Sequence, residues 1–363
     1  MQARTHFPKP RQAAGFSLVE IMVALVIGMI GTIVMLQLFA LGEGHKRATT
    51  GTSDAQSNGA IALYGLERDL RQAGYGVSDV KLLGCNLALP LAGAVAPALG
   101  RAATTLNNLA PLTINHASIP GGDANTDTLL VVFGNGNGSP QGDGITSQPA
   151  ATQYAVQTAS AFTGNDRVIA APQTRATPCA LSVDTVAGIT SPNVTVSTGV
   201  ANVAGGTLFN LGQAPSIRAY AVRGGNLTMC DHMLNDCTGA ANVGNAAVWT
   251  PIASNIVSLR AEYGIDTTAT MDGIVDAYNQ TTPTTACGWA KTLAVRLALV
   301  ARSGQYEKSA VTPAVPTWAG SASATPVAFD LSGTSSWQNY RYKVFETTVP
   351  IKNVVWMGVT AGC

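Results

Sequence analysis

The chain has 363 residues, of which only 11% are charged, and its formal net charge is +1. So small a charge gives no overall electrostatic attraction for nucleic acid, and we expect no nucleic-acid partner. The length corresponds to about two domains and suffices to bury a core. Gly, Ala, Thr, Asn and Ser dominate the middle of the chain, which is typical of loop-rich β structure rather than of a helical enzyme core.

A short basic head opens the chain, and an apolar segment follows it. Arg4, Lys9 and Arg11 precede Gly15, and the residues from 21 to 41 carry no charge. A helix of about 21 residues is about 31 Å long, which matches a hydrocarbon core of about 30 Å. A secretory signal peptide has a shorter apolar stretch with its cleavage site after it. Here we expect the apolar segment to stay in the mature protein as a membrane span, residues 16–41.

The junction reads Gly15-Phe16-Ser17-Leu18-Val19-Glu20 and resembles the processing site of type IV prepilins and pseudopilins. The resemblance implies that a prepilin peptidase cuts between Gly15 and Phe16 and that Phe16 becomes N-methylated. It also implies that Glu20 pairs with the N-terminal amine of a neighbouring pilin. A carboxylate inside a membrane helix is costly and marks a functional position when a partner can be named. The alternative is an ordinary anchor in which Glu20 lies at headgroup level.

The flanking charges and the cysteines indicate an exported body. The head has more Lys and Arg than the far flank of the span, where Lys46 and Arg47 lie, so the head is expected in the cytoplasm. All the cysteines lie beyond the span, and an even number favours disulfides in an oxidising compartment. Cys230 and Cys237 enclose a short loop and form the favoured local pair, while Cys363 is expected to tie down the C-terminus. The six candidates are Cys85, Cys179, Cys230, Cys237, Cys287 and Cys363.

The apolar segment is expected to continue as one long helix. Leu63, Leu66, Leu70 and Ala73 recur at helical spacing, and glycines then end the helix. The pattern predicts a helix over 16–73 whose second half is amphipathic and packs on a sheet.

Strands are expected after this helix. Residues 77–125 show no clear period and predict an irregular connection. Short strands are predicted over 128–133, 153–157, 180–186, 193–197 and 217–223. Residues 257–265, 293–299 and 340–349 are predicted as strands of one antiparallel sheet, the first two half-buried because apolar and polar residues alternate.

Several later segments resemble the PilW family of minor pilins. They are Arg68-Asp69-Leu70-Arg71-Gln72-Ala73-Gly74-Tyr75-Gly76, Tyr263-Gly264-Ile265-Asp266, Val295-Arg296-Leu297-Ala298-Leu299 and Tyr340-Arg341-Tyr342-Lys343-Val344-Phe345. The resemblance implies an α+β pilin-like ladle fold with a long N-terminal helix, half transmembrane and half amphipathic, on a disulfide-stabilised antiparallel β-sheet domain. It divides the chain into a leader (1–15), the helix (16–73) and a β-rich periplasmic or extracellular domain (74–363).

The resemblance also implies a role in priming pilus assembly. Partners would be the prepilin peptidase, the major pilin, other minor pilins in a tip complex, the inner-membrane assembly platform and a tip adhesin. The protein would cross the bacterial inner membrane once, with its C-terminal domain in the periplasm, and reach the pilus tip after assembly. The alternatives are a pseudopilin of a type II secretion system and a membrane-tethered module that binds DNA or an adhesion target.

Candidate catalytic and metal-binding residues are few, and no enzyme or cofactor is predicted. The sequence contains no Walker loop, no nucleophile elbow and no His-Glu-x-x-His motif. Cys230, His232 and Cys237 do not match a structural zinc spacing. Asp266, Asp272 and Asp276 form the one calcium candidate, with a solvated hairpin loop as the alternative. The tryptophans are expected to be core anchors: Trp249, Trp289, Trp318, Trp337 and Trp356.

Overall fold

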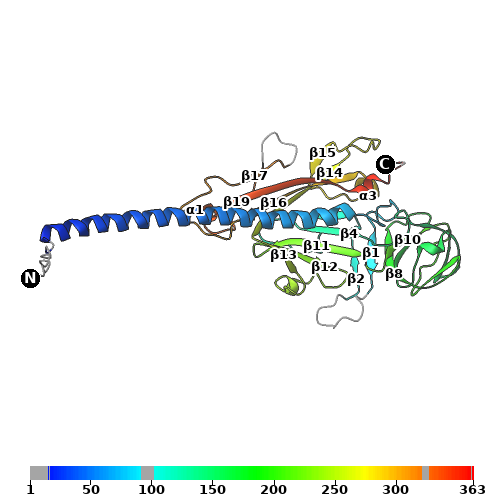
Figure 1. Ribbon diagram of the computed structural model, residues 1–363. Coiled ribbons are helices and arrows are strands. Elements are labelled where there is room, and N and C mark those ends of the chain that lie inside the picture. The colour runs from blue at the N-terminus through cyan, green and yellow to red at the C-terminus, as the bar shows by residue number, and fades with distance from the viewer. Residues whose placement is uncertain (1–14, 16, 91–101, 321–326, 361) are drawn as a thin grey trace, which may run out of the picture. The chain divides into compact units, whose positions relative to one another are not determined.

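The computed structural model describes residues 15, 17–90, 102–320, 327–360 and 362–363. The chain divides into two compact units, Met1–Gly51 and Thr52–Cys363, and the helix α1 (Leu18–Gln72) contributes residues to both. Figure 1 labels α1 and the main elements of the second unit.

In the first unit the described residues are helical from Leu18 onward, and all side chains from Ser17 to Arg47 are exposed. The apolar stretch makes α1 long and hydrophobic enough to cross a membrane. Two of the first charged residues after this stretch form an ion pair, in which Arg47 Nε donates to Glu43 Oε1 at 3.1 Å. This i,i+4 pair stabilises the helix.

In the second unit α1 buries one face. Ala55, Ala62, Leu66 and Leu70, with Ala73 just after the helix, are at most 1% exposed, and they recur at intervals of three, four or seven residues. Their core also contains residues from the sheets on which the helix packs. The sequence predicted a helix over 16–73; Phe16 lies outside the described residues.

Among the described residues, three large groups of strands and a two-stranded sheet, β17-β18, form the second unit. A four-stranded sheet has the order β15-β14-β16-β19, with β14 (Ile256–Ile265), β15 (Ala277–Asn279), β16 (Thr292–Arg302) and β19 (Tyr342–Pro350). A five-stranded sheet has the order β13-β12-β11-β4-β3, with β3 (Leu112–Ile114), β4 (Leu129–Phe133), β11 (Ser216–Arg223), β12 (Asn226–Asp231) and β13 (Thr250–Ser254). All pairs within these two sheets are antiparallel.

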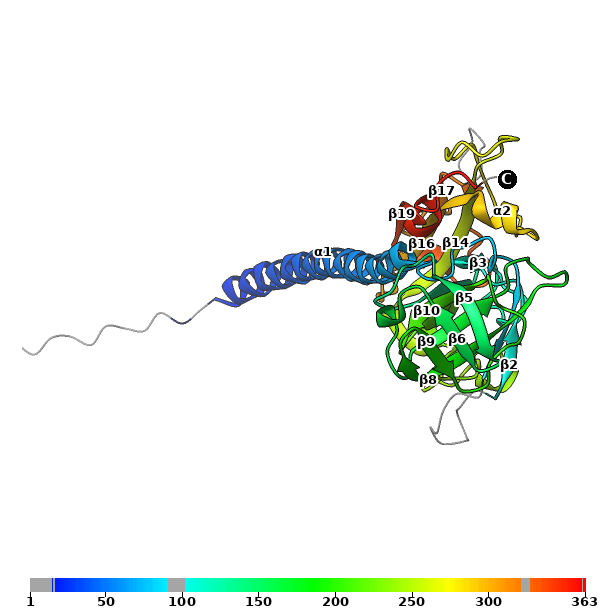
Figure 2. The same ribbon diagram turned by 90° about the vertical axis from the view of Figure 1, so that its right-hand side faces the viewer.

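The third group has the order β2-β1-β8-β7-β10-β5-β6-β9, and β9 also pairs with β8, which closes a barrel (Figure 2). Its strands are β1 (Asn86–Leu89), β2 (Thr104–Leu106), β5 (Asp143–Ala150), β6 (Gln153–Val156), β7 (Arg167–Ala171), β8 (Ala180–Thr190), β9 (Asn193–Val196) and β10 (Thr207–Gly212). Among the described strands of this group, β1 and β8 are the one pair that runs parallel. The smaller elements are β17 (Thr317–Trp318), β18 (Val327–Ala328), α2 (Ala286–Ala290), α3 (Lys352–Val355) and the 3₁₀ turns η1 (Ala159–Ala161), η2 (Ala240–Asn242) and η3 (Trp337–Asn339).

The barrel is an insertion into the five-stranded sheet. β4 and β11 are neighbours in that sheet, with Phe133 opposite Ser216, and β5 to β10 come between them in the chain. Val168 and Ala170 of β7 point into the barrel core, while Ile169 and Ala171 join a second core with the five-stranded sheet. That sheet therefore has α1 on one face and the barrel on the other, which explains why all of β4 is buried.

The sequence predicted the fold class correctly and several details incorrectly. A long helix packs on antiparallel sheets, and all six cysteines are paired: Cys85–Cys179, Cys230–Cys237 and Cys287–Cys363. The expected strands at 128–133, 153–157, 180–186, 193–197 and 217–223 correspond to β4, β6, β8, β9 and β11. Residues 77–125 are not wholly irregular, because β1, β2 and β3 lie there.

The prediction that β14 and β16 are half-buried is wrong. Ser258 and Glu262 of β14 are also buried, and Glu262 lies 3.8 Å from Arg296 of β16. The segment between β16 and β19 covers the face opposite α1, where Trp318, Phe329 and Leu331 pack on Ala298 and Val300. The apolar and polar residues that alternate along β14 and β16 therefore lie on two packed faces. They do not separate a buried face from a solvent-exposed face.

Candidate assembly site at the start of α1

The first turn of α1 is closed by a reciprocal pair of hydrogen bonds. Glu20 N donates to Ser17 Oγ at 3.3 Å, and Ser17 N donates to a Glu20 carboxylate oxygen at 3.4 Å. This is a capping box, which satisfies two backbone donors that a helix N-terminus leaves unpaired. A negative carboxylate is also favourable beside the positive end of the helix dipole. Glu20 is thus held at the helix start by local chemistry.

The capping role of Ser17 was not predicted from the sequence, although a Ser-x-x-Glu pattern is typical of a capping box. Gly15 is exposed and lies outside the helix α1. Phe16 lies outside the described residues. A peptidase acting at this junction would find the Gly15 carbonyl outside the helix.

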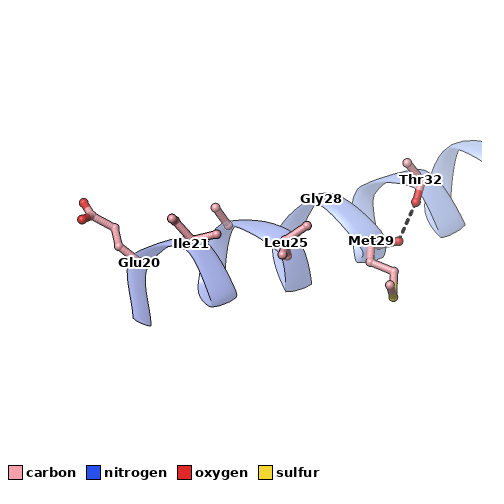
Figure 3. A pocket seen from close by; sticks show the side chains of 7 residues that line it. Glu20, Ile21, Leu25, Gly28, Met29 and Thr32 are labelled. Carbon is pink, nitrogen blue, oxygen red and sulfur yellow. Dashed lines mark hydrogen bonds between the residues drawn. The ribbon is translucent and has the colours of Figure 1, made fainter. Parts of the chain in front are cut away.

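One face of α1 continues from Glu20 as a row of small side chains. Ala24, Gly28 and Thr32 follow at intervals of four residues, flanked by Ile21, Leu25 and Met29 (Figure 3). A Cβ placed on Gly28 would meet nothing within 4 Å, so the backbone is open to close approach by another helix. Thr32 Oγ1 donates to the Met29 carbonyl at 2.8 Å, which pairs its hydroxyl inside the helix.

The arrangement provides a charged end and a close-packing seam on one helix face. The Glu20 carboxylate accepts one N–H from Ser17, and an ionised carboxylate has about four acceptor positions. It therefore retains capacity for an ammonium group. Side chains of small volume let two helix backbones approach, which supplies most of the attraction between helices in lipid.

Two family models match the chain. The model of the prokaryotic N-terminal methylation motif matches residues 10–36, and the model of type IV pilus-assembly protein W matches residues 220–353. The chain thus contains a C-terminal region similar to the PilW family and a prepilin-type N-terminal motif. No curated protein and no solved structure matches it.

The two matched regions hold most of the residues that carried the resemblance. The methylation-motif match contains Gly15, Phe16 and Glu20, and together with the apolar helix it indicates membrane anchoring. The PilW match runs from β11 into α3 and includes the segments at 263–266, 295–299 and 340–345. The segment 68–76 and the inserted barrel lie outside both matches.

The segment 68–76 contains a buried carboxylate that the sequence analysis did not single out. Asp69 is fully buried and accepts from Arg218 Nη1 at 2.7 Å and from the Tyr220 hydroxyl, both on β11. Burial and the Asp69 charge raise the pKa of Tyr220, so Tyr220 stays a donor. In the sequence, the position of this charged residue among the core-facing Leu66, Leu70 and Ala73 was the signal that could have predicted its burial. Asp69 fixes the end of α1 to the five-stranded sheet.

The calcium candidates lie in one loop but are occupied by that loop's own donors. Asp266 accepts from Thr268, Asp272 N and Gly273 N, and Asp276 Oδ2 accepts from Thr267 N at 2.7 Å. Asp272 Oδ1 caps Ile274 N at 2.9 Å. Among the described residues, no three His, Cys, Asp or Glu side chains gather as a metal site. The calcium site stays a prediction.

The remaining candidates fall into structural roles. Cys230 and Cys237 are bonded to each other, so neither offers a thiolate beside His232. Of the tryptophans, Trp249, Trp289 and Trp318 are buried as expected, and Trp337 is half-buried. The prediction is wrong for Trp356, which is 71% exposed because α3 carries it to the surface.

Proposed function

We propose that this protein is a minor pilin that primes type IV pilus assembly, a structural role without catalysis. The observation that carries the proposal is the joint occurrence of the methylation motif with its Glu20 cap and the PilW match. The same match favours a pilus over a type II secretion system, the second reading of the N-terminus. Partners under this proposal are the prepilin peptidase, the major pilin, other minor pilins in a tip complex, the inner-membrane platform and a tip adhesin.

The mechanism begins with removal of the head after Gly15, which frees the Phe16 amine. The protein is then held by α1 in the inner membrane with its C-terminal body in the periplasm. During assembly Glu20 of this chain accepts the N-terminal ammonium of a neighbouring pilin, and the row Ala24, Gly28 and Thr32 packs on that neighbour's helix. Neutralising the carboxylate removes the cost of a charge in lipid, so the contact is strongest where no water competes. The assembled protein resides at the pilus tip.

Mass analysis of the N-terminal peptide from native membranes tests the first step. We expect a chain that begins with N-methylated Phe16, and we expect Gly15→Ala to block most processing. An intact head on the membrane-derived protein would contradict the proposal.

Substitution of Glu20 tests the second step. Glu20→Ala should leave the protein in the membrane but abolish or sharply reduce surface fibres, counted by electron microscopy. Glu43→Ala is the matched control, because Glu43 lies on the same helix and is exposed. Normal fibre numbers with Glu20→Ala would overturn the assembly role and favour the third reading, a tethered binding module.

A further inference from the structure

A groove lies where three segments of the second unit meet, beyond the C-terminal end of α1. Its walls come from the loop after α1, from the strand β10 with the loop before β5, and from α3. Figure 1 shows α3 beside that end of the helix, and Asn353 Nδ2 donates to the carbonyls of Gln72 and Ala73. The groove encloses about 410 Å³. This volume lies within the range of small-molecule sites, about 300–1,000 Å³.

Trp356 lines the groove. Its backbone is hydrogen-bonded, but its side chain is largely exposed. It is 71% exposed, whereas Trp249, Trp289 and Trp318 are at most 3% exposed. Its backbone N–H donates to the Lys352 carbonyl at 2.8 Å, and the disulfide Cys287–Cys363 fixes the chain just beyond it. A large aromatic ring left in water forfeits about 1.5–3 kcal/mol of burial free energy. An exposed indole that lines a groove is a suitable surface for a ligand to cover.

The other groove walls carry mixed donors and acceptors that are already oriented. Lys81 Nζ donates to Thr207 Oγ1 at 2.7 Å, and Asp79 Oδ1 accepts from Lys81 N at 2.8 Å. An ammonium has three donors and a carboxylate about four acceptor positions, so both retain capacity. Gln141 adds an amide. One positive and one negative side chain favour a ligand without net charge.

We propose that this groove binds a neutral sugar residue of a glycan. A pyranose presents an apolar C–H face, which suits the Trp356 indole, and a rim of hydroxyls that both donate and accept. Those hydroxyls match Lys81 as donor, Asp79 as acceptor and Gln141 as both. A purely apolar ligand would displace water from the remaining donor and acceptor positions of these groups without replacing its hydrogen bonds, at a cost in affinity. An anionic ligand would meet Asp79.

A protein surface is the competing occupant. A specific protein interface covers about 800 Å² on each partner and has an apolar centre. The walls around Trp356 instead place the charged and amide side chains of Asp79, Lys81, Gln141 and Asn353 among small polar and apolar residues in a concave space. These features favour a small polar ligand.

The test is binding of neutral oligosaccharides to the full chain in a detergent without a sugar headgroup. The probes are malto-, cello- and chito-oligosaccharides and neutral galactose-containing oligosaccharides, measured by isothermal titration calorimetry and by saturation-transfer NMR. We expect at least one series to bind and Trp356→Ala to weaken that binding by about tenfold or more. Trp356→Phe should retain part of the affinity, because it keeps an aromatic face.

Two further variants separate the site from general effects. Tyr64→Ala is the matched control, since Tyr64 is also 71% exposed but lies on α1; it should leave sugar binding unchanged. Lys81→Met should weaken binding while thermal unfolding stays close to that of the unsubstituted chain. Because Trp356 is exposed, fold loss is not expected in Trp356→Ala, and N-terminal processing serves as an independent check on the proposed function.

Two results would overturn the proposal. One is that none of the sugar series binds the unsubstituted chain. The other is that sugar binding persists in Trp356→Ala while co-purification with other pilins is lost, which would assign the groove to a protein partner.

Discussion

The two halves of α1 are both rich in apolar residues, yet they bury different amounts of them. Between Ser17 and Arg47 every side chain is exposed, including Leu25 at 65% and Phe39 at 74%. Between Thr52 and Gln72 one face is buried to 0–1%, while Ile61 and Tyr64 on the opposite face stay exposed. A helix that is apolar on all sides needs an apolar surrounding, whereas a helix with one apolar stripe needs one packed partner. Pattern, rather than hydrophobicity, thus separates the membrane half from the body half.

The largest expected effect sharpens this comparison directly. Leu66→Ala should lower the free energy of unfolding of the body by about 3–5 kcal/mol, because it leaves a cavity in a fully buried core. Leu25→Ala removes the same atoms from the exposed half and should leave body unfolding unchanged. Thermal unfolding of both variants in detergent measures the difference. Equal shifts for the two would remove the distinction between the halves.

The buried carboxylate of the second half gives the next effect. Asp69→Ala should destabilise the body by about 2–3 kcal/mol, because it leaves Arg218 and the Tyr220 hydroxyl without their acceptor. The Arg218 side chain is 25% exposed, and water relieves part of the cost. Asp54→Ala, at an exposed position of the same helix, is the control. Denaturant unfolding curves that coincide for Asp69→Ala and the unsubstituted chain would contradict the proposed anchor.

Two glycines within the second half should respond in opposite directions. A Cβ on Gly59 would overlap the ring of Phe345, so Gly59→Ala should destabilise by about 1–2 kcal/mol. A Cβ on Gly65 would meet nothing within 4 Å, so Gly65→Ala should stabilise by about 0.5–1 kcal/mol through helix propensity. Unfolding temperatures of the pair provide the measurement. A stabilising Gly59→Ala would show that β19 does not lie against this turn of α1.

Acid should affect the body more than the membrane half. Burial alone would raise the pKa of Asp266, but hydrogen bonds from Thr268 and from the Gly273 and Asp272 amides outweigh it and lower the pKa to about 2. The stabilisation is therefore present above the unfolded pKa of about 4 and is lost as pH falls toward 2. Asp266→Asn should flatten the dependence of the unfolding temperature on pH between 4 and 2, with Asp54→Asn as control. An unchanged slope would contradict the assigned role of Asp266.

The sequence carried the features that depend on local pattern. The span, the amphipathic half of α1 and the strands β14, β16 and β19 all follow from periodicity over a few turns or residues. The capping box was also readable, since Ser17 and Glu20 are three residues apart. The short separation of Cys230 and Cys237 likewise favoured the pairing that the structure shows.

The longer-range features needed the fold. Closure of the barrel depends on β9 pairing with both β6 and β8, and short strands with mixed exposure give no register signal on their own. The second covered face of β14 and β16 depends on Trp318, Phe329 and Leu331, which follow both strands in the chain. Alternating apolar and polar residues in a strand do not reveal that both of its faces are buried when each face packs on a different segment of the chain.

The sequence by itself determined the class of this protein: a prepilin-type junction, an apolar helix and a PilW-like C-terminal region, each encoded in contiguous residues. Only the tertiary structure decided that residues inserted between β4 and β11 close into a barrel, that Asp69 reaches Arg218 and Tyr220, and that the exposed Trp356 lines a groove with Lys81 and Asp79. The reason is physical. Helix periodicity and capping arise from neighbours along the chain, whereas burial and pairing arise from residues that folding brings together across more than a hundred positions.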